Sequence, residues 1–499
     1  MTHPRPPASP AALVVHPDDD VAIALAPVAK GEAAAGVVAN ADIPKGHKIA
    51  LRALSRGEAV RRYGWPVGLA AADIAPGDHV HSHNLKTALE GEEDYAFTPA
   101  TAPAPGHAPL DAVFGGYRRA DGRAGTRNEI WVIATVGCVA RTAQRIAEAA
   151  ARRFEGRVDG VVALTHPFGC SQLGDDLVHT RKILAALAGH PNAGGVLIVG
   201  LGCESNQIGP LLEAAPDLDP ARLKAFSAQA AEDEIEAGLE AVEALVAIAE
   251  TDRREPCPVS DLVVGMKCGG SDGFSGLSAN PLTGRITDIV TGAGGRAIIT
   301  EIPEIFGAEH TLLARADTEA VFGKAVDVIN GFKRYFLDHG QPVYENPSPG
   351  NKDGGITTLE EKSMGAVQKA GGARLMDVIG YGERATAPGL TLLEAPGNDA
   401  VSSTALTAAG ATVIVFTTGR GTPLGFPAPT LKIASGSALA ERKPHWIDFD
   451  AGPVLAGEPM PAAAERLFEL ILRTASGEKT RNEINGEREI AIWKSGVTL

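Results

Sequence analysis

The most informative pattern in the chain is a short apolar run that ends in charged and small polar residues. Residues 262–266 read Leu-Val-Val-Gly-Met, which predicts a buried strand. Lys267 and Cys268 follow directly, and then a loop at 269–276 that holds four glycines and Asp272. Such a loop can turn its backbone N–H groups towards an anion. Because ligands of open α/β sheets bind beyond the carboxyl ends of the strands, this loop is the first candidate for a binding site.

The same order of apolar run, loop and cysteine occurs three more times. Apolar runs at 130–136, 161–164 and 196–199 lead into loops in which a cysteine directly follows a glycine, namely Cys138, Cys170 and Cys203. The fifth cysteine, Cys257, lies in a Glu-Pro-Cys-Pro segment and does not share the pattern. We predict that the four strand-end cysteines line one crevice.

The rest of the chain alternates between helical and strand-like periods. Helical periods occur at 140–154, 171–187, 227–250, 317–339 and 400–409, and strand-like runs at 297–300, 390–393 and 413–416. This alternation is typical of α/β domains with mostly parallel sheets. We therefore predict an α/β domain at 114–255 and a second, Rossmann-like α/β domain at 256–499, with a Pro-, Ala- and Thr-rich linker at 91–113.

Residues 1–90 have short alternating runs and no long helical period, so they predict a small β-rich domain. Residues 42–48 and 73–79 are similar to each other, and each copy supplies a glycine turn followed by an extended run. After the second copy, strict alternation would place His79, His81 and His83 on one face of a strand. We consider His81 and His83 as catalytic groups or ligands, against the alternative that they are ordinary solvated histidines.

Composition and charge exclude several classes of protein. Of 499 residues, 44% are hydrophobic and 21% charged, which is typical of a soluble globular protein. The formal net charge of −15, without a basic stripe, argues against nucleic acid, although local cations still allow a small anionic substrate. No apolar run reaches the length of a membrane span, and the N-terminus does not resemble a signal peptide. Five cysteines without paired spacing suggest reduced thiols, so we expect a cytoplasmic protein.

The strand-end loops resemble those of the altronate and galactarate dehydratase family. The motifs are Gly137-Cys138, His-Pro-Phe-Gly-Cys-Ser-Gln-Leu-Gly-Asp-Asp at 166–176, Gly-Leu-Gly-Cys-Glu at 200–204 and Lys-Cys-Gly-Gly-Ser-Asp-Gly at 267–273. Further matches are Glu-Asn-Pro-Ser-Pro-Gly-Asn at 345–351, Ala-Pro-Gly-Asn-Asp at 395–399, Thr-Gly-Arg-Gly-Thr-Pro at 418–423 and Trp-Ile-Asp-Phe-Asp at 446–450. The resemblance extends from about residue 12 to Leu499.

This resemblance implies a SAF-type β domain at the N-terminus, in agreement with the internal repeat, followed by the α/β domains. It also implies a dehydratase that depends on Fe²⁺, with Mn²⁺ as the alternative, and that converts hexonate or hexarate acids into 2-keto-3-deoxy acids. For this chain we expect D-altronate to be converted into 2-keto-3-deoxy-D-gluconate. The expected partner is thus a small sugar acid, without nucleic acid or membrane, and we expect a homo-oligomer.

Dehydration of a sugar acid removes the proton at C2 and expels hydroxide from C3, so the site needs a base, an acid and cationic groups for the carboxylate. The candidate catalytic residues are His166, Lys267, His81 and His83, and His166 has the alternative of a hydrogen-bonded core histidine. The candidate substrate-binding residues are Arg127, Arg420, Asn398, Asp272 and Glu345. Arginine can clamp a carboxylate with two hydrogen bonds, and Glu345 lies on a long loop that can close over substrate. Ordinary solvated loops are the alternative for these residues.

The candidate metal ligands are the thiols of Cys138, Cys170, Cys203 and Cys268. Strand-end cysteines are also often small buried hydrophobic residues, which is the alternative without function. An iron–sulfur cluster is a further alternative, although the chain lacks a close Cys-x-x-Cys pair.

Two rival functions remain open at this stage. Within the enzyme class, the rival is galactarate dehydration or another hydroxy-acid elimination, such as that of a sulfo-lyase. The rival of a different class is a non-catalytic protein that binds a nucleotide or another anion in the Rossmann-like half. The absence of a Gly-x-Gly-x-x-Gly motif that opens a helix, and of a Gly-Lys-Ser/Thr loop, argues against the latter.

Overall fold

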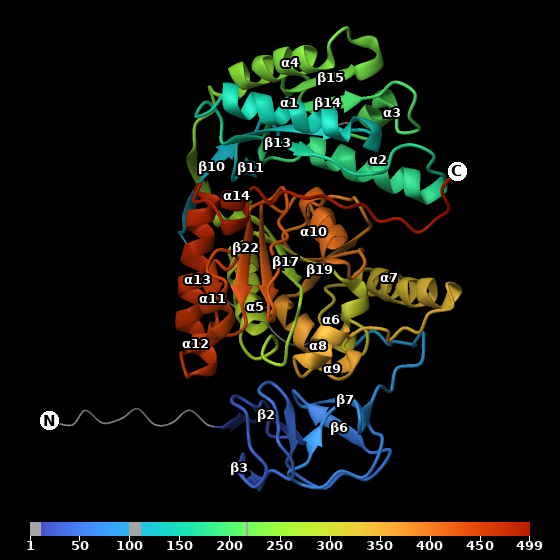
Figure 1. Cartoon of the computed structure of the whole chain (residues 1–499), viewed down its shortest axis with the longest axis vertical. Helices are drawn as coiled ribbons and strands as arrows, with labels where there is room; N and C mark the ends of the chain where they lie inside the picture. Colours follow the sequence, from blue (N-terminus) through green and yellow to red (C-terminus); the bar gives the residue numbers. More distant parts are fainter. Residues whose placement is uncertain (1–10, 99–110, 216–217) are drawn as a thin grey trace, which may run out of the picture.

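Three regions of the chain follow one another along the long axis of the molecule, in an order that differs from the sequence (Figure 1). The computed structural model describes residues 11–98, 111–215 and 218–499. The C-terminal region lies in the middle, the N-terminal β region at one end and the second region at the other. The predicted linker at 91–113 lies partly outside the described residues, as does the start of the N-terminal domain.

The N-terminal region is built from short antiparallel strands, which confirms the predicted β-rich domain. One sheet has the order β1-β2-β5-β8, a second the order β6-β7-β9, and β3 pairs with β4. The strands are β1 Ala12–Leu13, β2 Val21–Ala24, β3 Ala33–Ala34, β4 Val37–Val38, β5 Lys48–Ala50, β6 Ala59–Arg62, β7 Trp65–Ala70, β8 His79–Val80 and β9 Leu85–Lys86.

The second region contains a parallel sheet of the order β13-β12-β14-β15. Its strands are β12 Glu129–Ala134, β13 Gly160–Leu164, β14 Ala193–Gly200 and β15 Leu223–Ser227, and its helices are α1 Ala140–Arg153, α2 Gly174–Ala188, α3 Ile208–Glu213 and α4 Glu234–Ala249. Alternate residues of β12 point to opposite faces, so that Ile130 and Val132 pack with α1 and α4, whereas Trp131 and Ile133 pack with α2. The helix predicted at 227–250 starts later than expected, because Asp233 caps it and a short 3₁₀ helix, Ala228–Ala230, follows β15.

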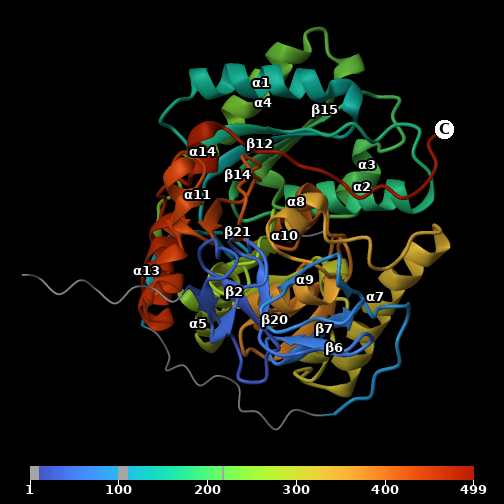
Figure 2. The ribbon, with the colours of Figure 1, turned by 60° about the horizontal axis from the view of Figure 1, so that its bottom comes forward.

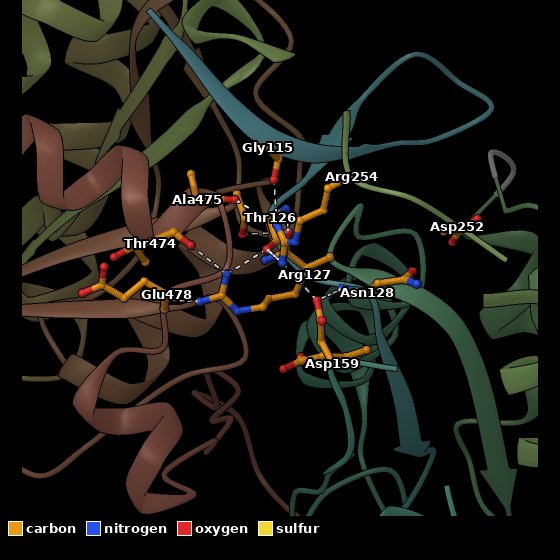
Figure 3. Close-up of polar contacts among 12 residues, drawn as sticks. Gly115, Thr126, Arg127, Asn128, Asp159, Asp252, Arg254, Thr474, Ala475 and Glu478 are labelled. Atoms are coloured by element: carbon orange, nitrogen blue, oxygen red, sulfur yellow. Dashed lines mark hydrogen bonds and ion pairs between the residues drawn. The ribbon is translucent and has the colours of Figure 1, made fainter. Parts of the chain in front are cut away.

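A small antiparallel sheet connects the second region to the C-terminal one. It consists of β10 Val113–Arg118, β11 Ala124–Gly125 and β16 Glu255–Pro258. Beside it, Arg127 is almost fully buried and donates to both carboxylate oxygens of Glu483, at 2.6 and 2.8 Å. Arg127 also donates to the carbonyl of Thr474, and Arg254 to that of Ala475, so that both arginines tie the two regions together (Figure 3).

The C-terminal region contains seven parallel strands in the order β19-β20-β18-β17-β21-β22-β23. They are β17 Val263–Cys268, β18 Arg296–Ile299, β19 Leu375–Ile379, β20 Gly389–Leu393, β21 Val413–Thr418, β22 Thr430–Ala434 and β23 Phe449–Asp450. Helices α5 (Ala279–Gly292) and α13 (Met460–Ala475) cover one face. Helix α10 (Asp399–Ala408) covers the other face and shares a core with α2 of the second region (Figure 1).

The remaining helices of this region are α6 His310–Leu313, α7 Glu319–Asp338, α8 Pro349–Asp353, α9 Leu359–Ala366, α11 Ser437–Arg442, α12 Gly452–Leu455 and α14 Arg481–Asn485. The long loop predicted around Glu345 therefore leads into α8, which Ser348 caps through its side chain. Across the part of the chain that is described, no helix combines the length and apolarity needed to cross a membrane.

The N-terminal region docks on the C-terminal one through buried charges. Lys48 donates to both oxygens of Glu361, at 2.9 and 2.8 Å, and Arg62 donates to the same carboxylate. Strand β7 lies beside α9, which carries Glu361 (Figure 2). The loop after Cys268 approaches closely as well, because a Cβ on Gly273 would lie only 2.1 Å from the carbonyl oxygen of Gly46. Glycine at 273 is thus required by this contact.

The end of the chain returns to the second region. The backbone N–H of Leu499 donates to the carbonyl of Ser171 at 3.0 Å. The N–H groups of Ser495 and Gly496 donate to the two carboxylate oxygens of Asp176, at the start of α2, and Figure 1 shows the C-terminus beside this helix.

Candidate functional site

The seven-stranded sheet changes direction at β17. Strand β18, the next in sequence, lies on one side of β17, and β21 lies on the other. The loops that leave β17 and β21 are therefore joined at their ends, where the N–H groups of Gly419 and Arg420 both donate to the carbonyl of Gly270, at 3.1 and 3.0 Å. Ligands of open α/β sheets bind at such a reversal, beyond the carboxyl ends of the strands.

Lys267, at the end of β17, is fully buried at this position. Its ammonium group donates to Glu301, to Asp399 at 2.8 Å and to the carbonyl of Cys268 at 2.6 Å. Glu301 follows β18 and Asp399 begins α10, so three strand or helix ends converge here. The side chain of Asp399 is 36% exposed and connects the buried cluster to solvent.

Cys268 lies next to Lys267 and is surrounded by ionisable groups. The ammonium of Lys369, from the 3₁₀ helix that follows α9, lies 2.8 Å from the Cys268 sulfur and 3.3 Å from Glu301. The sulfur lies 3.5 Å from a carboxylate oxygen of Glu304. Lys362, on α9, donates to Glu304 at 2.8 Å and completes the group. We call Lys267, Cys268, Glu301, Glu304, Lys362 and Lys369 the lysine–carboxylate cluster.

The charges of the cluster fix the protonation of its members. Burial alone would lower the pKa of Lys369, but Cys268, Glu301 and Glu304 outweigh it and raise that pKa above its usual range. Burial opposes ionisation of Glu304 as well, yet the neighbouring lysines lower its pKa to about 2. Burial, together with Glu301, raises the pKa of Cys268 to about 12. Near neutral pH Lys369 is therefore an ammonium group, Glu304 an ionised carboxylate and Cys268 a neutral thiol.

Glu301 has an unusual backbone. Its φ of 68° and ψ of 54° lie in the left-handed region, which only a few other non-glycine residues of the described chain adopt. Such a conformation costs about 1–3 kcal/mol and persists only where the surroundings fix it. Here the contacts with Lys267, the Cys268 N–H and Lys369 hold the carboxylate in place.

The cluster also contains the only group of three candidate metal ligands that the described residues bring within 4.8 Å of one another, namely Cys268, Glu301 and Glu304. Each of these groups is already in contact with an ammonium, from Lys369, Lys267 and Lys362 respectively. A divalent cation would face the nearby lysines as like charges, and each of its ligands would have to give up a lysine contact. The arrangement therefore does not fit a divalent ion, and no catalytic step is assigned to a metal at this position.

Several predicted substrate-binding residues surround the cluster. Arg420 is exposed, and its side chain lies beside Gly350 at the start of α8. Asn398 is also exposed, and its side-chain oxygen caps α10. Asp272 is partly buried and accepts hydrogen bonds from Ser275 and Ser435, which stabilises the loop itself. Glu345 is exposed on the loop that precedes α8.

The predicted histidines of the N-terminal region lie at the end of α8. Strand β8 ends at Val80 and the chain turns at 81–84, so the prediction that His79, His81 and His83 share one face of a strand was wrong. Their rings nevertheless gather with His47, since the centroids of His47 and His81 lie 4.8 Å apart and those of His79 and His83 5.4 Å apart. His47 and His81 contact the carbonyls of Asp353 and Lys352, at the end of α8.

His166 and Arg127 both belong to the second region and have structural partners, His166 within that region and Arg127 in the C-terminal one. His166 is buried, its Nε2 contacts the carbonyl of Ala134 at 2.9 Å, and its Nδ1 accepts from the N–H of Phe168. Burial lowers its pKa to about 4, so the ring is neutral near pH 7. Arg127 is engaged with Glu483, as described above.

The four strand-end cysteines do not share one crevice, so that prediction was wrong. Cys268 is buried at the end of β17 in the C-terminal region. Cys138, Cys170 and Cys203 follow β12, β13 and β14 of the other parallel sheet, and all three are exposed.

Four members of the cluster were not among the predicted site residues. Glu301 and Glu304 follow the strand-like run at 297–300, so their position at a strand end was a usable signal. Lys362 and Lys369 lie about a hundred residues from Cys268, on elements without a local signal, and only the fold brings them to it.

An α/β fold with ionisable groups clustered at a strand reversal is typical of an enzyme. Comparison with known proteins agrees and gives the class as hydro-lyase. Three family models match: "Altronate/galactarate dehydratase SAF domain" at residues 10–88, "D-galactarate dehydratase/Altronate hydrolase, second domain" at 116–250 and "D-galactarate/Altronate dehydratase, C-terminal" at 259–498. The chain belongs to the altronate/galactarate dehydratase family, as the sequence motifs predicted.

Named relatives cover nearly the whole chain. An altronate dehydratase of Escherichia coli (strain K12) is 48% identical over 97% of this chain and 99% of its own length. One of Bacillus subtilis (strain 168) is 47% identical over the same shares. A galactarate dehydratase (L-threo-forming) of E. coli is 34% identical over 88% of this chain and 87% of its own length.

Proposed function

We propose that this enzyme dehydrates D-altronate to 2-dehydro-3-deoxy-D-gluconate at the lysine–carboxylate cluster. The observation that carries the reaction class is the contact of two buried carboxyl groups, those of Glu301 and Glu304, with three buried lysines. The choice of D-altronate as substrate rests on the two altronate dehydratases, which are more similar to this chain than the galactarate dehydratase is.

The cluster offers the groups that the elimination requires. The ionised carboxylate of Glu304 accepts the C2 proton, and Glu301 is the second acceptor. The ammonium groups of Lys267 and Lys369 neutralise the charge that builds on the substrate carboxylate as the C2 proton leaves. Lys362 donates a proton to the departing C3 hydroxyl, since it is the third ammonium and lies beside Glu304.

Arg420 and Asn398 bind the substrate at the entrance. Both are exposed next to the buried cluster, and Asp399, the neighbour of Asn398, reaches Lys267. The guanidinium of Arg420 pairs with a carboxylate by two hydrogen bonds, and the side-chain amide of Asn398 reaches hydroxyl groups.

The proposed cofactor is Fe²⁺, with Mn²⁺ as the alternative. Thiols, which are soft ligands suited to iron, are available on the second region, away from the ammonium groups of the cluster. We further propose a cytoplasmic homo-oligomer, which agrees with reduced thiols and with the absence of a membrane-crossing helix among the described residues.

The test is turnover by anaerobically prepared, iron-loaded enzyme on D-altronate, galactarate and D-gluconate, followed by formation of the 2-keto-3-deoxy acid. We expect D-altronate to be preferred, and the chelator-treated enzyme to lose activity. The matched variants are Glu304→Gln, which should abolish turnover, and Glu319→Gln on the exposed first turn of α7, which should not change it. Turnover of galactarate but not of D-altronate would show that galactarate is the substrate. Full activity of E304Q would contradict the proposed role of the lysine–carboxylate cluster in catalysis.

A further inference from the structure

Lys432, on β22, is a fully buried cation without a carboxylate partner. Six lysines of the described chain are buried, and five of them form an ion pair with a carboxylate: Lys48, Lys267, Lys333, Lys362 and Lys369. Lys432 forms no such pair with any described residue. Because an unpaired buried charge is costly, its presence needs a reason other than core packing.

The ammonium group of Lys432 is bound by backbone carbonyls of the loop that follows β21. Its Nζ donates to the carbonyl oxygen of Thr422 at 2.9 Å and to that of Leu424 at 2.6 Å. The carbonyl between these two, that of Pro423, accepts from the side-chain amide of Asn482 at 2.9 Å. Donors from outside the loop therefore hold three successive carbonyls. We call residues 419–425 the Arg420 loop.

The other end of the Arg420 loop is held at the proposed site. The N–H groups of Gly419 and Arg420 donate to the carbonyl of Gly270, and that of Gly421 donates to the hydroxyl of Thr418 at 2.9 Å. Arg420 thus lies between two attachments of the backbone. Its guanidinium is exposed and makes no hydrogen bond or ion pair with the described residues. The backbone of the loop, rather than a partner of the guanidinium, therefore fixes the position of Arg420.

Lys432 lies close to the lysine–carboxylate cluster without belonging to it. Lys267, Phe416 and Lys432 are in register on the neighbouring strands β17, β21 and β22. The Nζ atoms of Lys267 and Lys432 lie 5.6 and 5.2 Å from the centroid of the Phe416 ring. The ring separates the two ammonium groups and attracts both. Lys432 can therefore affect the site through the Arg420 loop, while the buried Phe416 ring stands between it and the reacting groups.

We propose that Lys432 is a positioning residue that holds Arg420 where the guanidinium binds the carboxylate of the substrate. The charge of Lys432 keeps the loop attached at Thr422 and Leu424. Loss of this charge loosens the loop and weakens substrate binding, but leaves the proton transfers at the cluster unchanged. The inference rests on the substrate-binding role proposed above for Arg420.

The charge of Lys432 depends on pH in a range that is accessible to assays. Burial lowers its pKa to about 8 from 10.5, and the surrounding carboxylates oppose this effect only in part. Since an ammonium group donates stronger hydrogen bonds than a neutral amine, deprotonation weakens the hold on the two carbonyls. KM should therefore rise as the pH increases through 8. The charged groups that face Lys432 are the carboxylates of Glu487, Asp448, Asp399 and Glu489 and, across the Phe416 ring, the ammonium of Lys267.

The test combines hydrogen exchange of the loop amides with steady-state kinetics on D-altronate. In Lys432→Met at pH 7, the amides of residues 419–425 should exchange about tenfold faster than in the wild type. KM should rise about tenfold, with kcat changed by less than about twofold. In an Arg420→Gln background, K432M should raise KM no further, because both substitutions act on one contact. Lys182→Met, exposed on α2, is the control and should change neither measurement.

Unchanged loop exchange or unchanged KM in a folded K432M protein would overturn the proposal, even if the melting temperature fell. If K432M fails to fold, the wild type alone decides. After correction for the intrinsic rate, its loop amides should exchange faster at pH 9 than at pH 7, and equal protection at both would overturn the proposal. Faster loop exchange in K432M without turnover of D-altronate by the wild type would refute the substrate proposed above and leave the hold of Lys432 on the loop standing.

Discussion

Lys48 of the N-terminal region and Glu361 of the C-terminal region form an ion pair in which neither side chain is exposed to solvent. The pair buries two opposite charges, and Arg62 adds a second cation to the same carboxylate. A buried ion pair is costly to break, because one partner alone leaves an uncompensated charge. This pair makes the position of the N-terminal region sensitive to single substitutions and to pH.

We expect Glu361→Gln to lower the free energy of unfolding by about 3–5 kcal/mol, because Lys48 and Arg62 would remain buried without an anion. The lysine and arginine lower the pKa of Glu361 to about 2 against the burial that opposes ionisation, whereas its ordinary value is 4.5. The unfolded state then binds more protons between these values, so wild-type stability falls as pH falls from 4.5 towards 2. Urea denaturation across this range should show a flatter acid limb for E361Q. Arg466→Gln is the control, because Arg466 pairs with Glu458 at the surface. This substitution should change the free energy of unfolding little at any pH.

Gly273→Ala should destabilise the same junction by about 1–3 kcal/mol, because the new methyl group would overlap the Gly46 carbonyl. Gly209→Ala, where nothing lies within 4 Å of the new Cβ, is the matched control and should be neutral or stabilising. Thermal melts of the two variants decide the matter. If G273A and G209A had the same melting temperature, the two loops would be able to move apart without a loss of stability.

Lys369→Met should reduce kcat by about 100-fold or more while the protein remains folded, because the ammonium beside Cys268 and Glu301 stabilises developing charge. Lys324→Met is the control, since Lys324 is largely exposed and pairs with Asp377 at 3.3 Å. Steady-state kinetics on D-altronate provide the measurement. A K369M enzyme with unchanged kcat would exclude Lys369 from the chemistry.

Arg420→Gln should act mainly on substrate binding. Loss of a charged hydrogen-bond donor costs about 1.5–3 kcal/mol, so we expect KM for D-altronate to rise about tenfold or more. Arg442→Gln, exposed at the end of α11, should leave KM unchanged. A purely structural role of Arg420 would instead lower the melting temperature and leave KM as it is.

The histidine group predicts a second pH effect, at higher pH. Burial and the neighbouring histidines lower the pKa of His79 to about 4 from 6.5. The unfolded chain therefore takes up a proton between these values while the folded protein does not, and stability falls as pH falls from 6.5 to 4. His79→Asn should flatten this part of the stability curve. His83→Asn, at the exposed edge of the group, is the matched control and should have a smaller effect.

Much of the fold follows from the local sequence. The apolar run at 262–266 predicted a buried strand, and β17 spans Val263–Cys268. A parallel strand that is buried on both faces must be apolar along its length, so it is visible in the sequence without knowledge of its neighbours. The helix predicted at 400–409 agrees with α10, because Asn398 marks its start.

The sites were harder to predict, because sequence does not reveal which strands share a sheet. Cys203 and Cys268 both follow a short apolar run, yet they lie at the ends of strands in different sheets. Lys369 is far from Cys268 in sequence, and only the packing of α9 and the helix after it places its ammonium at the sulfur. The histidines were predicted on a strand because alternation continues after His79, whereas the side chain of Asn84 closes a turn at His81.

The buried junction between the N-terminal and C-terminal regions has a consequence for how the chain can be divided. The contacts of Lys48, Arg62 and Gly46 with Glu361 and Gly273 are non-covalent, and the chain leads from the N-terminal region into the second region before it reaches the C-terminal one. A covalent connection between two docked regions raises the effective concentration of one at the other. Residues 1–98 and 111–499, produced as two polypeptides, would therefore assemble into an active pair at sufficient concentration, and the covalent connection would be dispensable for catalysis.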